Sequence, residues 1–417
     1  ASLTSTATWL GGSSGNWNTA SNWCGGVPTA GSNLTIPANT TITLDGANEA
    51  IVGNLTINAT GSLILPSNAK LTVTGNLVNN GTITIESGAT LVQGPSSSIA
   101  TGTTGTFNVK QAVTGAGGAG SAPTGRFWYM GVPLNSLTRG AAFGTAGTDN
   151  RLWSWTEGTG WSSQLPDNTP LYPTTGYVFR TSAPSTTLNF SGTSLYSANM
   201  NPTNLSNNGG PLGGCHLLSN PYTAYLDWDQ VVAQANTGTS NISTTYCVRS
   251  YNSTNNEMVY DTYNASGGVA SNPSSLAVTQ FIAPLQAFWI RVNTGSTGNV
   301  NITKSMLSHQ SSAIGLKDIT SFTAFARLNL VSGNFFDQVV VYTDANAAIE
   351  VEEYDSEKFF LPNKPQVYCK VGEKKLVINA LKSGKAQNAV PLTIELPSTQ
   401  VYKFEMAESF VENGLVI

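Results

Sequence analysis

The sequence has 417 residues and a formal net charge of -4, with 40% hydrophobic and only 10% charged residues. This hydrophobic content excludes a disordered chain, and the length predicts more than one domain. Without a basic patch, nucleic acid is not a predicted partner, and no apolar run approaches the roughly 20 residues that insertion into a membrane requires. Low charge combined with abundant Gly, Ser, Thr and Asn is typical of β-rich extracellular proteins.

Three tryptophans, Trp9, Trp17 and Trp23, stand among Gly, Asn and Pro residues near the start of the sequence. Exposed indole rings can stack on sugars. The favoured interpretation is instead a cap, because a β-solenoid whose first coil has no neighbour exposes strand edges.

Short alternating segments follow, most clearly in "LTINATGSLILPSNAKLTVTGNLVNNGTITIESGATLVQG" at 55–94. Apolar residues recur at every second position, as at Leu55 and Ile57, which predicts strands with one inward face. Glycines separate these strands at intervals shorter than the hairpins of a sandwich need. Residues 1–106 are therefore predicted to form a short, Trp-capped β-solenoid.

Residues 107–316 lack this repeat and contain aromatic segments such as "RFWYMGVP", "RLWSWTEGTGW" and "QAFWIRVN" between polar loops. This pattern predicts an aromatic-rich antiparallel β-sandwich. The segment "LDWDQVVAQA" predicts one short helix that begins near Asp227. Trp153, Trp155 and Trp161 are interpreted as core residues, with a glycan-stacking site as the alternative.

The charge density changes near Leu316. Residues 1–316 hold 9 basic and 10 acidic side chains, whereas 317–417 hold 10 and 13. Alternation returns in "QVVVYTD", "KKLVINAL" and "VYKFEMAE", so 317–417 is predicted to be a C-terminal β-sandwich. The acidic run "EVEEYDSE" at 350–357 is interpreted as a solvated face. The fold class predicted for the whole chain is all-β.

The residues give little sign of catalysis. Cys215 and His216 are adjacent, but neighbours on a strand point to opposite faces, so a thiol dyad is not predicted. Asp227 and Asp229 form a carboxylate pair that is a weak signal for calcium or for a secreted hydrolase, and Asp227 would serve equally well as a helix N-cap. We therefore predict that the protein is not an enzyme and has no cofactor, with Ca²⁺ at this pair as a minor alternative.

Four cysteines neither form a dense scaffold nor show the spacing of a zinc site. Cys215 and Cys247 lie in one region and could form a disulfide in an oxidising compartment. The alternative is that all four cysteines are small buried apolar residues.

A set of motifs occurs in order along most of the chain: "W…GNW…SNW…GGVP", the solenoid, "GRFWYMGVP", "GGCHLLSNPYTAYLDWD" and "IAPLQAFWIRV". In these the sequence resembles modular cell-surface proteins that Bacteroidota export through the type IX secretion system. The last region is similar to the β-sandwich that precedes the C-terminal sorting domain of those proteins. The resemblance implies contact with the secretion machinery during export, an outer-surface or released location, and a role in adhesion or surface structure.

In that family the last sandwich continues beyond the position of Ile417, so either the sequence stops short of the full sandwich or the mature subunit ends here with an incomplete sandwich and an exposed strand edge. Such an edge can accept an extended segment of another copy, and "ASLTSTATW" at the start of the sequence is the predicted donor. The expected contacts between subunits are Ala1, Leu3, Thr8, Leu415, Val416 and Ile417. The predicted function is a non-catalytic structural subunit that polymerises head-to-tail into a filament or sheath, with a monomeric adhesin or module binding surface glycans as the alternative.

Overall fold

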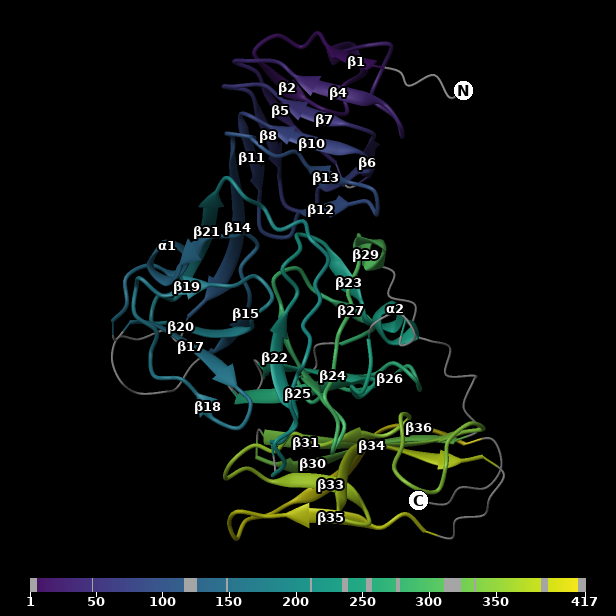
Figure 1. The fold of residues 1–417 in the computed structure, drawn as a ribbon. Coiled ribbons are helices and arrows are strands. Elements are labelled where there is room, and N and C mark those ends of the chain that lie inside the picture. The colour runs from purple at the N-terminus through teal and green to yellow at the C-terminus, as the bar shows by residue number, and fades with distance from the viewer. Residues whose placement is uncertain are drawn as a thin grey trace.

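The computed structural model confirms an all-β protein, with three regions that follow one another along the molecule (Figure 1). It describes residues 6–46, 48–115, 126–147, 149–210, 212–234, 239–252, 257–274, 278–310, 324–333, 335–383 and 389–411. The solenoid lies at one end of the molecule and the C-terminal sheet lies at the other (Figure 1). No helix in these ranges is long and apolar enough to cross a membrane.

The N-terminal region is a β-solenoid, as predicted, with three faces of parallel strands. The first face contains β1 (Thr6–Trp9), β4 (Asn33–Ile36), β7 (Leu55–Ile57), β10 (Asn76–Asn79) and β13 (Ser98–Ile99), with β3 (Trp23–Cys24) antiparallel at its outer edge. The second contains β2 (Ser14–Asn16), β5 (Thr41–Thr43), β8 (Ser62–Leu65), β11 (Thr82–Ile85) and β14 (Thr106–Thr114), and the third β6 (Glu49–Val52), β9 (Lys70–Val73) and β12 (Thr90–Gln93).

Equivalent side chains stack from coil to coil, and Leu34, Leu55 and Leu77 form one such column. The glycines of the sequence mark corners where successive coils approach closely. A Cβ atom at Gly81 would lie 2.1 Å from the carbonyl oxygen of Gly61 in the preceding coil. Only glycine fits this contact without displacement of the backbone.

The three tryptophans near the start of the chain close the first coil, which confirms the cap. Trp17 is fully buried, and Trp9 and Trp23 are 8% and 3% exposed. Their rings meet edge to face, with centroids 4.9 Å apart for Trp9 and Trp23 and 5.4 Å apart for Trp17 and Trp23. The described short helix Ala20–Asn22 lies within the same segment.

The boundary predicted after residue 106 falls inside a strand. β14 begins as a rung on β11 and ends as the partner of the antiparallel strand β21 (Ser185–Gly192) of the middle region. One hydrophobic core joins solenoid residues such as Phe107 to middle-region residues such as Phe143 and Phe190. The first two regions therefore share a core rather than meeting at a linker.

The middle region is built from several small antiparallel sheets. Near the solenoid lie a four-stranded sheet of β15 (Trp128–Met130), β20 (Tyr177–Thr181), β17 (Asn150–Thr156) and β18 (Gly160–Trp161), the pair β16 (Leu137–Thr138) and β19 (Pro170–Leu171), and helix α1 (Arg139–Phe143). Next comes a five-stranded sheet of β22 (Cys215–Ser219), β28 (Ala287–Arg291), β24 (Thr245–Asn252), β25 (Glu257–Asn264) and β26 (Val269–Ser271). Beside it are β27 (Phe281–Ile282), β23 (Tyr225–Asp227), β29 (Leu307–Ser308), helix α2 (Trp228–Ala233) and the short helix Lys304–Met306.

The C-terminal region is sandwich-like, as predicted, with all its strands hydrogen-bonded in one continuous order. Its strand order is β35 (Leu392–Glu395), β33 (Gln366–Val371), β34 (Lys374–Lys382), β31 (Phe335–Asp344), β30 (Ala324–Ser332) and β36 (Lys403–Val411), with β32 (Ser356–Glu357) also paired to β34. Val340 and Tyr342 on one face of β31 pack against Val269 of the middle region. Val339 and Val341 on the other face belong to a second core that we call the outer core.

His309 attaches the segment after β29 to the third face of the solenoid. Its Nδ1 lies 2.6 Å from the hydroxyl of Thr90, and its Nε2 lies 2.9 Å from the hydroxyl of Thr72. Because Thr72 donates its own proton to Glu49 at 2.6 Å, Nε2 of His309 is the donor and Nδ1 the acceptor. The neutral ring is thus fully hydrogen-bonded.

This contact predicts a dependence of stability on pH. Burial lowers the pKa of His309 from 6.5 to about 4, nearby Lys70 acts in the same direction, and Glu49 acts against it. Between these two pH values the unfolded chain binds more protons than the folded one, so this group makes the folded state more stable as pH rises. We expect the stability advantage of wild type over His309→Gln to grow by on the order of 2 kcal/mol between pH 4 and 6.5.

The measurement is urea unfolding of both proteins at several pH values. Asp261 and Asp355 have the opposite effect, because burial raises the pKa of each to about 6 and the folded state therefore loses stability as pH rises. Both proteins contain these carboxyl groups, so their contribution cancels when the two free energies of unfolding are subtracted. A pH-independent difference would show that the ring is not held neutral at this position.

Candidate functional site

The aromatic residues proposed as a glycan platform are largely packed against other side chains. The rings of Trp155 and Trp161 have centroids 5.2 Å apart, and both contact Trp289 edge to face, at 5.3 and 5.9 Å. Trp155 also donates its Nε1–H to the carbonyl oxygen of Cys215 at 2.8 Å. Trp153 packs separately, with its ring centroid 6.1 Å from that of Phe127.

Of these three tryptophans, Trp161 has the greatest free surface, at 42% exposure. A sugar could therefore stack on Trp161, whereas the rings of Trp155 serve to join β17, β18 and β28. The structure brings the rings of Trp155 and Trp161 together, and Trp153 packs against the same hydrophobic core as Trp155. Core packing thus accounts for Trp155, and glycan binding stays a prediction for Trp161.

These contacts predict different effects for two alanine substitutions. Trp155→Ala removes a ring enclosed by other rings and should lower the free energy of unfolding by about 3–5 kcal/mol. Trp161→Ala should cost clearly less, because part of this ring already faces water. Chemical denaturation of both variants tests the difference, and a glycan array run on the same samples tests binding. A larger loss for Trp161→Ala would contradict this assignment of the two rings.

Cys215 and Cys247 are free thiols, so the predicted disulfide is not formed. They lie on β22 and β24, and β28 runs between these two strands. Strands two places apart in a sheet are separated by about 10 Å, beyond the roughly 7 Å between Cα atoms that a disulfide allows. Burial raises the pKa of both thiols, as expected for inert apolar cysteines. Cys369 is likewise buried, and Cys24 is exposed.

The other residues with potential chemistry have structural partners. His216 donates Nε2–H to the carbonyl oxygen of Ser206 at 2.8 Å, and Cys215 beside it lies on the opposite face of β22. Asp227 is the N-cap of α2, accepting from the backbone N–H groups of Asp229 and Gln230. Asp229 accepts from the hydroxyl of Tyr263 at 3.0 Å. Within the described ranges, no group of three or more His, Cys, Asp or Glu side chains could hold a metal ion.

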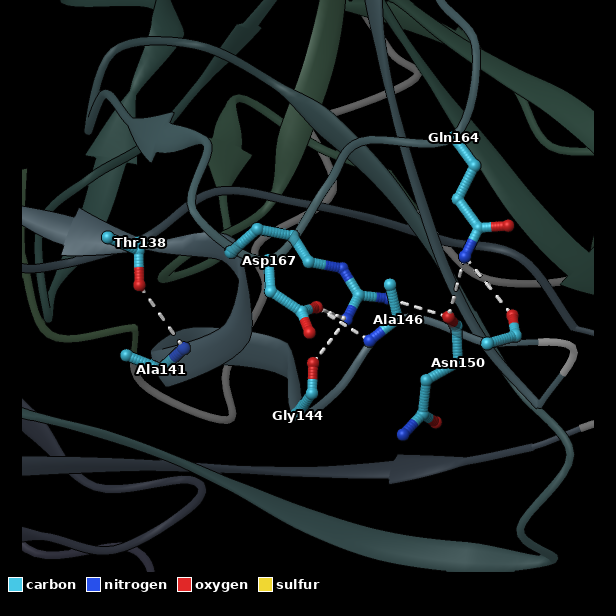
Figure 2. Close-up of polar contacts among 9 residues, drawn as sticks. Thr138, Ala141, Gly144, Ala146, Asn150, Gln164 and Asp167 are labelled. Atoms are coloured by element: carbon cyan, nitrogen blue, oxygen red, sulfur yellow. Dashed lines mark hydrogen bonds and ion pairs between the residues drawn. The ribbon is translucent and has the colours of Figure 1, made fainter.

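A buried arginine at the start of α1 also serves the fold. Arg139 is fully buried, binds Asp167 at 2.9 Å, and donates to the carbonyl oxygens of Asn150 at 2.6 Å and of Gly144. The backbone N–H of Ala146 donates to the same carboxylate at 2.6 Å (Figure 2). The two terminal nitrogens of the guanidinium thus hold one loop together by donating to a carboxylate and two carbonyl groups of the protein itself.

Half of the ten exposed large apolar residues among the described residues lie between positions 394 and 406 of the C-terminal region. Five residues, which we call the edge patch, are at least 41% exposed: Ile394, Leu396, Val401, Phe404 and Met406. Ile394 lies on β35 and Phe404 and Met406 lie on β36, the two outermost strands, whereas Leu396 and Val401 lie in the segment between them.

The sheet register shows which face these residues occupy. Phe404 and Met406 on β36 are opposite Leu330 and Leu328 of β30, both of which contact the outer core. At the other end of the strand order, Ile394 on β35 is opposite Val367, a fully buried residue of the same core. The exposed apolar side chains of both outermost strands therefore lie on the same face of the sheet as the outer core.

β36 also has a free backbone edge within the part of the chain that the structure describes. It pairs with β30 on one side, and no described strand pairs with its other side. An unpaired row of N–H and C=O groups beside exposed apolar side chains is suited to the addition of another strand. We regard β36 and the edge patch as the candidate functional site.

The predicted contact residues are only partly placed. Thr8 lies in β1, where it is exposed and opposite Cys24 of β3. The backbone of Thr6–Trp9 is thus already paired inside the solenoid, so this half of the predicted donor is not available for strand addition. Ala1, Leu3, Leu415, Val416 and Ile417 lie outside the described residues.

Fold and site define an all-β protein with a capped solenoid at one end and, at the other, a sheet whose strand β36 has an outer edge that no described strand pairs with. A family model described as a domain of unknown function, DUF8693, matches residues 8–410, and the chain belongs to this family. No curated protein matches the chain. No solved structure matches it either.

Proposed function

We propose that this protein is a non-catalytic extracellular structural subunit that assembles with copies of itself by β-strand addition. The observation that carries the proposal is the free edge of β36 next to Phe404 and Met406, which extend a buried core into solvent. A strand of a neighbouring copy that lay on this edge would satisfy the backbone groups and cover these side chains.

Other features support this reading. The buried thiols, the capping aspartate and the buried arginine described above are all used by the fold, and the low charge is typical of β-rich extracellular proteins. The resemblance to surface proteins exported by the type IX secretion system suggests the location. A contact between two different surfaces of the subunit does not close on itself, so such copies would form a filament or sheath.

The acceptor side of this contact can be tested on β36. Met406→Lys places a charge among the apolar residues of the edge, a change that natural edge strands use to prevent pairing. We expect wild type to form filaments or large oligomers and Met406→Lys to remain monomeric, as measured by light scattering and electron microscopy.

The matched control is Glu405→Gln, which changes the charge by the same amount on the other face of the same strand. It should assemble like wild type. If Met406→Lys assembled as well as the control, the β36 edge would not be the contact.

The donor side can be tested separately. The sequence suggests the N-terminal segment, in which residues 1–5 come before the paired strand β1. Deleting residues 1–5 should abolish assembly while leaving the melting temperature unchanged, because the solenoid keeps β1 and its tryptophans. Assembly of the shortened protein would assign the donor strand to another segment.

The alternative function is binding of surface glycans by a monomeric adhesin. The exposed face of Trp161 is the observation in its favour. A protein that stays monomeric under all conditions and loses glycan binding in Trp161→Ala would support this alternative.

A further inference from the structure

The interior of the C-terminal sheet contains a buried lysine and a buried aspartate in direct contact. Nζ of Lys358 lies 2.9 Å from Oδ1 and 2.7 Å from Oδ2 of Asp337. Their side chains are only 4% and 8% exposed. An amine nitrogen this close to both oxygens of a carboxyl group necessarily lies close to the carbon between them.

Both residues are fixed by the fold. Asp337 lies on the outer-core face of β31, opposite Leu330 of β30 and two positions from Val339. Lys358 follows β32 directly, and its backbone N–H donates to the carbonyl oxygen of Lys375 at 2.9 Å. Leu330 and Val339 are at most 1% exposed, so buried apolar side chains flank the carboxyl group of Asp337.

A third group polarises the carboxyl. The backbone N–H of Val367, at the start of β33, donates to Oδ2 of Asp337 at 2.7 Å. A fixed donor at this distance stabilises negative charge that develops on a carboxyl oxygen when its carbon is attacked. The site thus combines a nucleophile, an acceptor carbon and a donor to the oxygen that would remain.

We propose that Lys358 and Asp337 form an intramolecular amide bond that cross-links the C-terminal sheet. This inference does not depend on the proposed function. The bond from Nζ to Cγ forms and the bond from Cγ to Oδ1 breaks, while Oδ2 becomes the amide oxygen. Oδ1 leaves as water with two protons from the ammonium group, one passed across the contact and one as the bond breaks.

The reaction is a condensation, so it needs no oxidant, reductant or co-reactant. Reacting groups held at about 3 Å can reach effective concentrations of about 10⁵ M or more.

The cross-link would join β31, a central strand, to the segment that follows β32. An ion pair between the same residues costs desolvation of two charges, whereas an amide buries no net charge. A covalent bond at this position would also resist mechanical separation of the two segments.

The test is the intact mass of the full, purified protein under denaturing conditions. We expect a mass lower than that of the sequence by one water molecule. Digestion after glutamate cuts the chain between the two residues at Glu350, Glu352, Glu353 and Glu357, yet the fragments containing Asp337 and Lys358 should remain joined.

Lys358→Met should restore the mass expected from its sequence. Lys374→Met is the matched control, because Lys374 forms a more exposed ion pair with Glu357, and it should keep the mass deficit. Full mass in wild type, with the two fragments separate after digestion, would overturn the proposal and leave an ion pair. This result is decisive even if Lys358→Met fails to fold, and a water loss located at another pair would overturn the proposal equally.

Discussion

A β-sheet can end only where something satisfies or shields the hydrogen-bonding groups of its outermost strand. In this protein the solenoid meets that requirement differently at each end. At its start, β3 and the rings of Trp9, Trp17 and Trp23 close the first coil. At its other end β21 pairs with β14, and Thr223 exchanges two hydrogen bonds with the backbone of Leu91 in β12. The middle region is therefore the second cap of the solenoid, which explains why the two share one core.

Features that depend on neighbours in the sequence could be predicted. The solenoid could be predicted from the alternation of apolar residues and the spacing of glycines. Both the inward face of a strand and the corner of a coil depend on residues that are close in sequence. The helix at α2 was predicted for the same reason, since Asp227 caps it from the adjacent position. The end of the solenoid could not be placed, because Phe107 belongs to a strand that is a rung at one end and a middle-region strand at the other.

Features that depend on strand order could not be predicted. Cys215 and Cys247 are close in sequence by the standard of this chain, yet β28, which comes after both, inserts between their strands. The acidic run was interpreted as solvated, but Asp355 is 7% exposed and accepts from the N–H of Ala380. Likewise "VYKFEMAE" indicates a strand but not where that strand lies in the sheet. Its place at the edge, beside the exposed Phe404 and Met406, follows only from the strand order. The Lys358–Asp337 contact had no signal in the sequence at all.

The chain has few charged residues, and the buried side chains of Arg139 and Lys358 both bind groups of the protein itself. Arg139 is matched by Asp167 and two carbonyl oxygens, and Lys358 by Asp337, so burial of charge here serves internal connections. The exposed apolar residues of the edge patch differ from these buried charges, because they lie on or between the two outermost strands of the C-terminal sheet and no described strand packs over them. One end of the molecule is thus closed by tryptophan rings, and at the other end no described strand pairs with the outer edge of β36. A subunit whose two ends differ in this way has a direction, and a direction is what any head-to-tail contact between identical copies requires.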